Sequence, residues 1–406
     1  MSTRTVRPVR TPLRTPAPPR TLLSAPRVDW LLIGAVAGLL VLGTLLVWSA
    51  TAPRDALTGG DSTAYLRKHL VNVAIGVVLL VVVLVTDHRW VRILAPVAYL
   101  ASIGGLVLVL TMGTTINGSR SWLMLGGLSV QPAEFAKLTV VIGMALLCAE
   151  RADWSRRGVR SFEVLAMLVI AGIPAGLILL QPDLGTMLVL AATVFGVLAV
   201  AGAGRMWLAG LTLGAVVGAI TAVSMGVLKP YQVDRFMAFT NPGLDPRGAG
   251  YNTEQARIAV GNGGLFGQGL FEGSQTRSGF VPEQHTDFIF TVAGEELGLI
   301  GSAVLIALLG VVLWRALRIA MRADDLFGRV AAAGIACWFG FQAFQNIGMC
   351  LGIMPVTGVP LPFVSYGGSS MFAGMLALGL LQNIHLRSST SGPTRLLVAP
   401  RVLVSR

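Results

Sequence analysis

The sequence predicts an all-α, polytopic membrane protein with ten transmembrane helices and a long extracytoplasmic segment between the seventh and the eighth. Of its 406 residues, 54% are hydrophobic and only 12% are charged, whereas soluble domains carry about 25% charged residues. The mean hydropathy is +0.73. Apolar stretches of about 20 residues recur along the chain, and this is the length that a helix needs to cross a bilayer.

The two ends of the chain are basic tails. Residues 1–28 are rich in arginine and proline and contain no acidic residue. Such a segment cannot bury a core, so we expect a disordered cytoplasmic tail. Residues 387–406 form a second basic tail, which we also expect in the cytoplasm. Residues 29–386 then make up the membrane domain.

Apolar length places ten spans in this domain. The first run, from Trp30 to Val47, is longer than the apolar core of a cleaved signal peptide, so we expect it to be retained. The eighth is longer than a perpendicular crossing needs, and we expect it to tilt, to kink near Gly294, Gly298 or Gly301, or to extend into the cytoplasm. The ten spans cover residues 30–50, 69–87, 91–112, 132–149, 162–181, 184–203, 206–228, 286–317, 328–353 and 364–386.

Positive charge predicts the orientation of the chain. Arginines cluster in residues 151–160 and 315–329, whereas the short connections after the third, fifth and ninth spans carry few, with Arg120 as the main exception. Cytoplasmic loops are enriched in lysine and arginine, so we expect these clusters and both termini in the cytoplasm. The net charge of +12 then favours contact with anionic lipids of the inner leaflet over contact with nucleic acid.

The outer side collects the unusual polar motifs of the chain. This one-sided placement predicts that any chemistry takes place in the outer half of the membrane. The motifs are N-G-S-R-S-W (117–122), Q-P-A-E-F-A-K (131–137), Q-P-D-L-G-T (181–186), F-V-P-E-Q-H-T-D-F-I-F (280–290) and P-L-P-F-V-S-Y-G-G-S-S (360–370).

The fourth motif places Glu283, His285 and Asp287 where a polar loop enters the eighth span. A carboxylate held at the mouth of a membrane helix is costly to bury and is therefore a functional candidate. The alternative is a helix cap, with Thr286 or Asp287 at the N-cap position and Glu283 interacting with the helix dipole. Glu295, further along the same helix, either polarises Asp287 or bonds to polar side chains of a neighbouring helix. The residues alone leave these alternatives open.

Lys137 and Asp183, two further charged residues of the outer motifs, have two interpretations each. Glu134 and Lys137 lie three residues apart and would share one face of the fourth span. Lys137 is either neutralised by Glu134 or joins Arg120 in a cationic site for a phosphate-bearing ligand. Asp183, in a tight Pro-Asp turn, is either the cap of the sixth span or a catalytic residue.

Residues 229–285 are too long for a simple connection. Within them, residues 251–260 are typical of a short amphipathic helix, and the glycines of residues 261–270 allow close backbone packing. Irregular backbone at membrane depth occurs only against protein or a wet cavity, which predicts a cavity beneath this segment. The sequence contains no P-loop, dinucleotide-binding or zinc-hydrolase motif. The energy would therefore come from an ion gradient or from an activated substrate in the membrane.

The five motifs, in this order, resemble those of the SEDS family (shape, elongation, division and sporulation), and the resemblance runs from the first span to the tenth. Residues 244–252 and 263–270 look like the elongation branch of the family rather than the division branch. The resemblance implies a peptidoglycan glycosyltransferase that polymerises lipid II, the undecaprenyl-pyrophosphate-linked disaccharide peptide, on the outer face of the cytoplasmic membrane. It also implies a class B penicillin-binding protein, a transpeptidase, as the partner. Gly348 and Gly352 would allow a partner helix to approach closely.

The resemblance also assigns roles to residues. The family's essential aspartate corresponds to Asp287, which we expect to act as the catalytic base, and the charged pocket positions of the family correspond to Arg120, Glu134 and Lys137. No metal ligands stand out, and the sequence leaves open whether a divalent cation assists at the pyrophosphate. We expect further contacts with the substrate from the same motifs, namely from Trp122, Asp183, Glu283, His285, Ser365 and Tyr366.

Two other classes of protein compete with this interpretation. A lipid II flippase or another transporter would also have ten spans, broken helices and charges within the membrane. The charged motifs lie on one side rather than at the midplane, and no internal repeat is visible, which favours the transferase. A scaffold for cell-wall enzymes would leave the buried charges unexplained.

Overall fold

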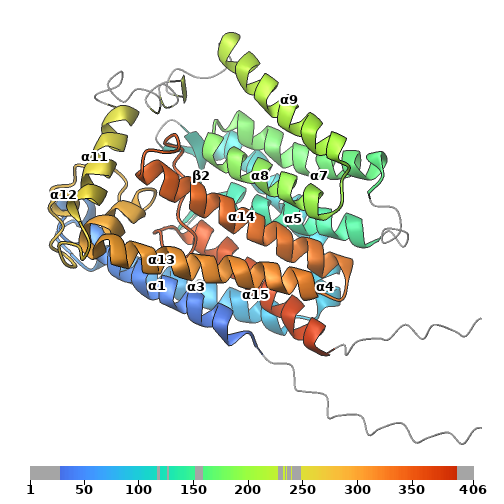
Figure 1. Ribbon diagram of the computed structural model, residues 1–406, viewed down its shortest axis with the longest axis horizontal. Coiled ribbons are helices and arrows are strands. Elements are labelled where there is room, and N and C mark those ends of the chain that lie inside the picture. Colours follow the sequence, from blue (N-terminus) through green and yellow to red (C-terminus); the bar gives the residue numbers. More distant parts are fainter. Residues whose placement is uncertain are drawn as a thin grey trace, which may run out of the picture.

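The computed structural model is a bundle of long helices with a small sheet at one end (Figure 1). It describes residues 28–116, 119–125, 128–150, 159–226, 232–233, 235, 239 and 248–390. The predictions for the N-terminal tail and for residues 391–406 lie outside these described residues. So does the arginine cluster of residues 151–158.

Each predicted span coincides with a long helix. Eight of the helices in the described part of the chain are long and apolar enough to cross a membrane. Of the other two, α8 is shorter, at 17 residues, and α15 is more polar; a count of ten crossings therefore stays a prediction. The helices are α1 (Trp30–Thr51), α3 (Ala64–Val85), α4 (His88–Met112), α5 (Pro132–Ala149), α7 (Ser161–Leu180), α8 (Leu184–Val200), α9 (Arg205–Ser224), α13 (Ile289–Arg322), α14 (Leu326–Cys350) and α15 (Gly368–Thr390).

Aspartate side chains cap several of these helices. An aspartate oxygen accepts a hydrogen bond from a backbone N–H of the first turn in α1, α4, α8 and α14. Such a cap satisfies one of the N–H groups that a helix leaves without a carbonyl partner. Helix α5 begins instead with Pro132, which lacks an N–H and suits the first helical position. The capping residues are Asp29, Asp87, Asp183 and Asp325.

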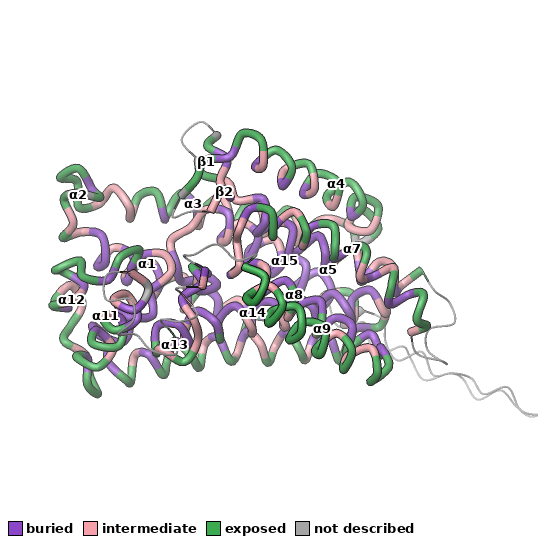
Figure 2. Tube along the Cα trace, turned by 90° about the horizontal axis from the view of Figure 1, so that it is seen from above, coloured by how far each residue is buried: buried purple, intermediate pink, exposed green. Residues whose placement is uncertain are grey.

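Helix α14 forms the centre of the bundle. It packs against α13, α8 and α5, while α15 packs against α3 and α1 packs against α13 (Figure 1). The residues of α5 and α14 are mostly buried, whereas α9 has no buried residue and α4 is largely exposed (Figure 2). The exposed apolar side chains of the outer helices are those that a surrounding bilayer would cover.

Three ion pairs join the connections that we expected in the cytoplasm. Arg92 pairs with Asp325, Arg315 with Asp29, and Arg387 with Asp87. They gather the start of α1, the α3–α4 connection, the α13–α14 connection and the last turns of α15 at one end of the bundle, which we call the ion-pair end. The opposite end holds the sheet and is called the sheet end. That the ion-pair end faces the cytoplasm stays a prediction.

The described part of the chain is mostly helical but also contains a small sheet, which was not predicted from the sequence. Strands β1 (Thr114–Ile116), β2 (Ser119–Leu125) and β3 (Leu128–Val130) form an antiparallel sheet in the order β1-β2-β3. Arg120 pairs with Thr115, and Leu123 pairs with Val130. Buried Ser121 and Leu123 alternate with exposed Arg120 and Met124 along β2, which is the period of a half-buried strand.

In residues 229–285, which we call the outer segment, the described part contains the helices α11 (Ala249–Asn262) and α12 (Ser274–Ser278). The first confirms the helix predicted at residues 251–260. The glycines that follow it pack backbone to backbone against α13, as predicted: a Cβ atom on Gly267 would lie 2.1 Å from the carbonyl oxygen of Glu296. No side chain fits there.

The predicted kink of α13 is confirmed at Gly298. This residue has φ +66° and ψ −164°, a conformation that only glycine adopts readily. The kink separates N–H and C=O groups from their helical partners, and the glycine segment takes them over. The N–H groups of Leu299 and Ile300 donate to the carbonyls of Gly264 and Leu265 at 2.9 and 3.1 Å. The outer segment is therefore bonded into the membrane helix at its break.

Candidate active site

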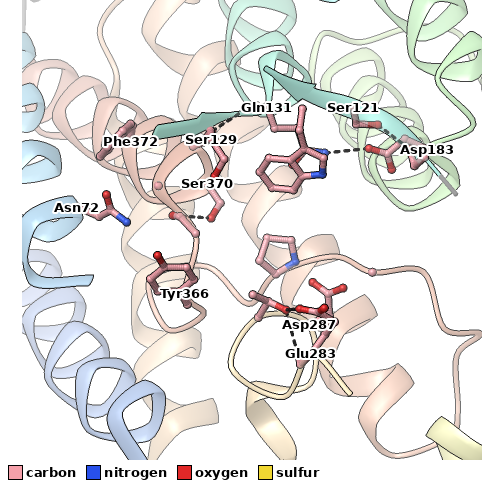
Figure 3. A pocket seen from close by; sticks show the side chains of 18 of the residues that line it. Asn72, Ser121, Ser129, Gln131, Asp183, Glu283, Asp287, Tyr366, Ser370 and Phe372 are labelled. Atoms are coloured by element: carbon pink, nitrogen blue, oxygen red, sulfur yellow. Dashed lines mark hydrogen bonds between the residues drawn. The ribbon is translucent and has the colours of Figure 1, made fainter. Parts of the chain in front are cut away.

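A cavity of about 600 Å³ opens at the sheet end of the bundle. Its walls come from α3, from β2 and β3, from the N-termini of α5, α8 and α15, and from the turn that precedes α13 (Figure 3). The motifs that are far apart in the sequence thus meet around one space. The sequence predicted a cavity beneath residues 229–285, and this is confirmed: the turn at residues 283–287 forms part of the cavity wall.

The cavity separates the predicted site residues into two groups. One group lines it: Trp122, Asp183, Glu283, Asp287 and Tyr366. The other group does not: Arg120, Glu134, Lys137, His285 and Ser365.

Asp287 lies in the turn just before α13. Its N–H donates to the carbonyl of Glu283 at 3.0 Å, and its own carbonyl accepts a hydrogen bond from Asn346 Nδ2 at 2.7 Å. Gly358, at φ +71°, comes so close that a Cβ atom there would lie 3.1 Å from Asp287 Oδ2. The carboxylate is thus held between the turn and the loop before α15.

The helix-cap interpretation of this motif is wrong. Phe288 occupies the N-cap position of α13, and no side chain caps that helix. The Thr286 hydroxyl donates to the carbonyl of Glu283 at 3.0 Å instead. The Asp287 carboxylate is therefore not used to start the helix and faces the cavity.

Burial raises the pKa of Asp287 to about 7. The negative charges of Glu283 and, to a smaller extent, Asp183 act in the same direction, while Arg235 opposes them. Loss of water disfavours a charged carboxylate, and neighbouring carboxylates disfavour it further. A carboxyl group whose pKa lies near neutrality can accept and return a proton under physiological conditions.

Glu283 and His285 stand on opposite sides of the same turn. Glu283 is exposed to the cavity and holds a left-handed backbone conformation, φ +48°, which is uncommon for a residue with a side chain. His285 is buried, with its ring edge-on to Tyr65 at 5.0 Å between centroids. Its carbonyl accepts a hydrogen bond from the N–H of Tyr366 at 2.9 Å. Burial lowers the pKa of His285, so this histidine packs the turn as a neutral ring.

Lys137 does not form a free cationic site, and that alternative is wrong. Its ammonium is fully buried and donates to Glu134 Oε1 at 2.8 Å and to Gln342 Oε1 at 2.7 Å. It also lies 5.1 Å from the ring centre of Trp338. A buried ammonium needs acceptors within the protein, and α14 supplies one that the sequence spacing did not reveal.

Arg120 is directed away from the cavity. Its guanidinium donates to the carbonyls of Gly113 at 2.7 Å and Thr111 at 2.8 Å. These carbonyls lie at the C-terminal end of α4, where a helix leaves its last C=O groups without partners. Arg120 and Lys137 therefore do not meet at one ligand, as we had expected.

Asp183 combines the two interpretations given to it. Its carboxylate caps α8 by accepting hydrogen bonds from the N–H of Thr186 at 3.0 Å and from its hydroxyl at 2.9 Å. The same carboxylate accepts from Gln131 Nε2 at 3.0 Å and lines the cavity (Figure 3). Three donors thus hold the Asp183 carboxylate in place.

Glu295 and Ser365 have structural roles. Glu295 accepts hydrogen bonds from the N–H groups of Gln275 and Thr276, at 2.7 and 2.9 Å, at the start of α12. Among the described residues it makes no hydrogen bond to Asp287 or to a neighbouring membrane helix. The alternative of a buried carboxylate bonded to a neighbouring helix is met by the adjacent residue, because Glu296 Oε1 accepts a hydrogen bond from the Ser49 hydroxyl of α1 at 2.5 Å. The hydroxyl of Ser365 accepts from the N–H of Leu361 at 2.7 Å and shapes the loop before α15.

The cations that do line the cavity were not predicted from the sequence. Arg67 and Lys68 reach it from the first turns of α3, and Arg235 from the outer segment. Asn72, on the same face of α3 as Lys68, lines it too. Polar residues spaced four apart at the start of an apolar helix were the signal that could have revealed this wall.

In the described part of the chain, no three His, Cys, Asp or Glu side chains are close enough together to bind a metal ion. Asp183, Glu283 and Asp287 share the cavity without forming such a cluster.

A helical membrane bundle with a carboxylic acid of raised pKa beside cations in one cavity is the arrangement of a candidate integral membrane enzyme. Comparison with known families narrows this class. The model of the cell cycle protein family of FtsW, RodA and SpoVE matches residues 29–390. The chain belongs to this family, which is the SEDS family, and is a peptidoglycan glycosyltransferase.

Relatives of both branches are similar over nearly their whole length. The chain is 39% identical over 380 residues to the "Probable peptidoglycan glycosyltransferase FtsW" of Allochromatium vinosum, covering 91% of this chain and 94% of that protein. It is 36% identical over 367 residues to the "Peptidoglycan glycosyltransferase MrdB" of Escherichia coli K12, covering 90% and 95%. The comparisons therefore do not separate the elongation branch from the division branch.

Two solved structures have the same fold. One, described as "Structural coordination of polymerization and crosslinking by a peptidoglycan synthase complex", aligns with a TM-score of 0.75 at 32% identity and covers 89% of this chain and 98% of that chain. The other is the rod shape determining protein RodA of Thermus thermophilus, with a TM-score of 0.64 at 32% identity, covering 88% and 96%.

Proposed function

We propose that this protein polymerises lipid II on the outer face of the cytoplasmic membrane, with Asp287 as the general base. The observation that supports this most directly is the Asp287 carboxyl group itself. It faces the cavity, does not cap α13, and has a pKa raised to about 7. A base with a pKa near the working pH contributes about 10²–10⁴-fold to a proton-transfer step.

The reaction can be written with this chain's own residues. Asp287 accepts the proton of the acceptor sugar hydroxyl as that oxygen attacks the anomeric carbon of the donor. The bond from this carbon to the pyrophosphate oxygen breaks, and undecaprenyl pyrophosphate leaves. A single displacement of this kind inverts the anomeric configuration, as in inverting glycosidases. The carboxyl group then returns its proton to water.

The elongation branch is the finer assignment that we favour, since residues 244–252 and 263–270 resemble that branch. The partner would then be a class B penicillin-binding protein, in line with the similar structure of a peptidoglycan synthase complex. Gly348 and Gly352 would not form the docking surface, because they pack within this chain. A Cβ atom on Gly348 would lie 2.7 Å from Met354 Cγ, and one on Gly352 would lie 2.9 Å from Arg257 Cδ.

Purified Asp287→Asn protein, supplied with lipid II, tests the proposal. The substitution keeps the shape of the side chain but removes its capacity to take up a proton. We expect glycan polymerisation, followed by gel electrophoresis of the chains, to fall by about 10²-fold or more while the melting temperature is maintained. Near-normal polymerisation by folded Asp287→Asn protein would contradict the role of the base.

A further inference from the structure

The N-termini of α5, α8 and α15 lie at the cavity, and they differ in what they can bind. A helix N-terminus presents N–H groups without carbonyl partners and a partial positive charge. Helix α5 starts with Pro132, which has no N–H, and carries Glu134 in its first turn. The N-terminus of α8 already binds the carboxylate of Asp183. Helix α15 starts with the uncharged sequence G-G-S-S at residues 367–370, all of which line the cavity.

A second, independent observation comes from Asn72 of α3. This side chain lines the cavity with only 7% of its surface exposed, and it has no hydrogen-bond partner among the residues that the structure describes. It faces the start of α15, since a Cβ atom on Gly368 would lie 3.4 Å from Asn72 Oδ1 and 3.6 Å from Nδ2 (Figure 3). The polar atoms of this amide are not fully buried, so the amide remains accessible from the cavity. An acceptor atom of a ligand would satisfy it.

Two cations of α3 line the same cavity as this amide. Lys68 precedes Asn72 by four residues and therefore shares its face of α3. Its ammonium forms no ion pair with any described residue and lies over the ring of Tyr65, 5.5 Å from its centre. Arg67 also lines the cavity and forms an exposed ion pair with Asp61. The charge of Lys68 is thus available to a ligand in the cavity.

We propose that the start of α15, Asn72 and Lys68 form the site that binds the pyrophosphate of the lipid-linked donor. This deepens the proposed function and rests on it. The N–H groups of residues 368–370, the Asn72 amide and the Lys68 ammonium would all donate to phosphate oxygens. Donors fixed in this way stabilise the charge that grows on the leaving group as its bond to the sugar breaks.

The position of this site suits a single displacement. Figure 3 shows Asn72 and Ser370 on one side of the cavity and Asp287 on another. An in-line reaction needs its base and its leaving group on opposite sides of the reacting carbon. The sequence had suggested Arg120 and Lys137 as the phosphate-binding cations. In the structure Arg120 donates to the Gly113 carbonyl and Lys137 to Glu134, so the proposed site takes over this role.

Binding to a catalytically impaired protein tests the site separately from the reaction. Undecaprenyl pyrophosphate and inorganic pyrophosphate are titrated into Asp287→Asn protein in nanodiscs, with and without Asn72→Leu or Lys68→Met. Arg89→Met is the control, because it removes one exposed positive charge from the start of α4, at the ion-pair end. We expect Asn72→Leu and Lys68→Met each to weaken binding of both ligands about tenfold or more, and Arg89→Met to leave it unchanged.

Equal binding by all variants would overturn the proposed site. Phosphatidylglycerol is titrated in the same way. If the variants weaken binding of phosphatidylglycerol alone and leave binding of the two pyrophosphates unchanged, these residues bind a phospholipid headgroup and the proposed site is overturned. The loss of pyrophosphate binding supports the site whether or not the wild-type protein polymerises lipid II. Failure of the polymerisation assay would instead count against the proposed function.

Discussion

The side-chain amide of Asn346 donates a 2.7 Å hydrogen bond to the backbone carbonyl of Asp287 and a second one, also of 2.7 Å, to the carbonyl of Val359. Asn346 is fully buried in α14. One side chain of the central helix therefore fixes both the turn that carries the carboxylate and the loop that packs against it. The position of Asp287 depends on this link as much as on its own turn.

We expect Asn346→Leu to lower the turnover number for lipid II polymerisation more than it raises the KM. The matched control is Asn383→Leu at the ion-pair end, where the amide donates to carbonyls that include Val83 at 3.0 Å and Thr86 at 2.8 Å. Both variants lose buried hydrogen bonds worth about 1 kcal/mol each, so both should melt at lower temperature. Only Asn346→Leu should slow the folded enzyme. An equal loss of turnover in both variants would show that Asn346 acts through stability alone.

The rate of polymerisation should follow the ionisation of Asp287. The deprotonated carboxylate is the active form, and its pKa is raised to about 7. The rate should therefore rise with pH to about pH 7 and then level off, and below that point it should fall about tenfold per pH unit. Glu283→Gln removes a negative charge that raises this pKa, so the midpoint should move to lower pH. Initial rates across the pH range give the midpoint. If Glu283→Gln leaves the midpoint unchanged, the ionisation that limits the rate is not that of Asp287.

The positions of the helices along the chain followed from the sequence because they depend on local properties. Apolar length determines where a helix can cross the membrane. The kink at Gly298 and the close packing of Gly267 followed because only glycine tolerates such backbone conformations and contacts. The sheet was missed because its strands are short and their alternation lies within residues that also fit a polar loop.

The partners of the buried charges could not be predicted from local properties. Lys137 binds Gln342, 205 residues further along the chain, and this depends on how α5 and α14 are rotated against each other. Asp183 and Lys68 face one cavity only because α8 and α3 both begin there. Such contacts are set by tertiary packing, so the residue types indicated chemistry but not which of them would share a site.

The Glu134–Lys137 pair should support stability more than substrate binding, the reverse of our expectation from the sequence. Lys137→Met leaves the buried carboxylate of Glu134 without its counter-ion, a change that costs about 3–5 kcal/mol in buried pairs. The double variant Glu134→Gln/Lys137→Met removes both charges and should recover much of the melting temperature. Thermal unfolding of the detergent-solubilised proteins compares them. A double variant less stable than the single one would argue against a paired role.

The orientation can be tested with one engineered cysteine at each end. Ser278 is exposed at the end of α12, at the sheet end, and Asp324 is exposed in the α13–α14 connection, at the ion-pair end. An impermeant thiol reagent added to intact cells should label Ser278→Cys and spare Asp324→Cys, because arginine-rich connections stay inside. Permeabilised cells, in which both should react, provide the control. Labelling of Asp324→Cys alone in intact cells would invert the topology.

The break in α13 should be required to hold the outer segment in place. Gly298→Ala forces a side chain into a backbone conformation that costs about 1–3 kcal/mol even at tolerant sites, and its Cβ atom would lie 2.3 Å from the N atom of Gly267. We expect residues 262–279 to detach and become sensitive to limited proteolysis, together with a loss of polymerisation. Gly310→Ala is the matched control, since nothing lies within 4 Å of its Cβ position in the same helix. It should resemble the wild type or stabilise the helix, because alanine favours helices over glycine by about 1 kcal/mol. Equal protease resistance in both variants would mean that the backbone hydrogen bonds at the break are not what secures the segment.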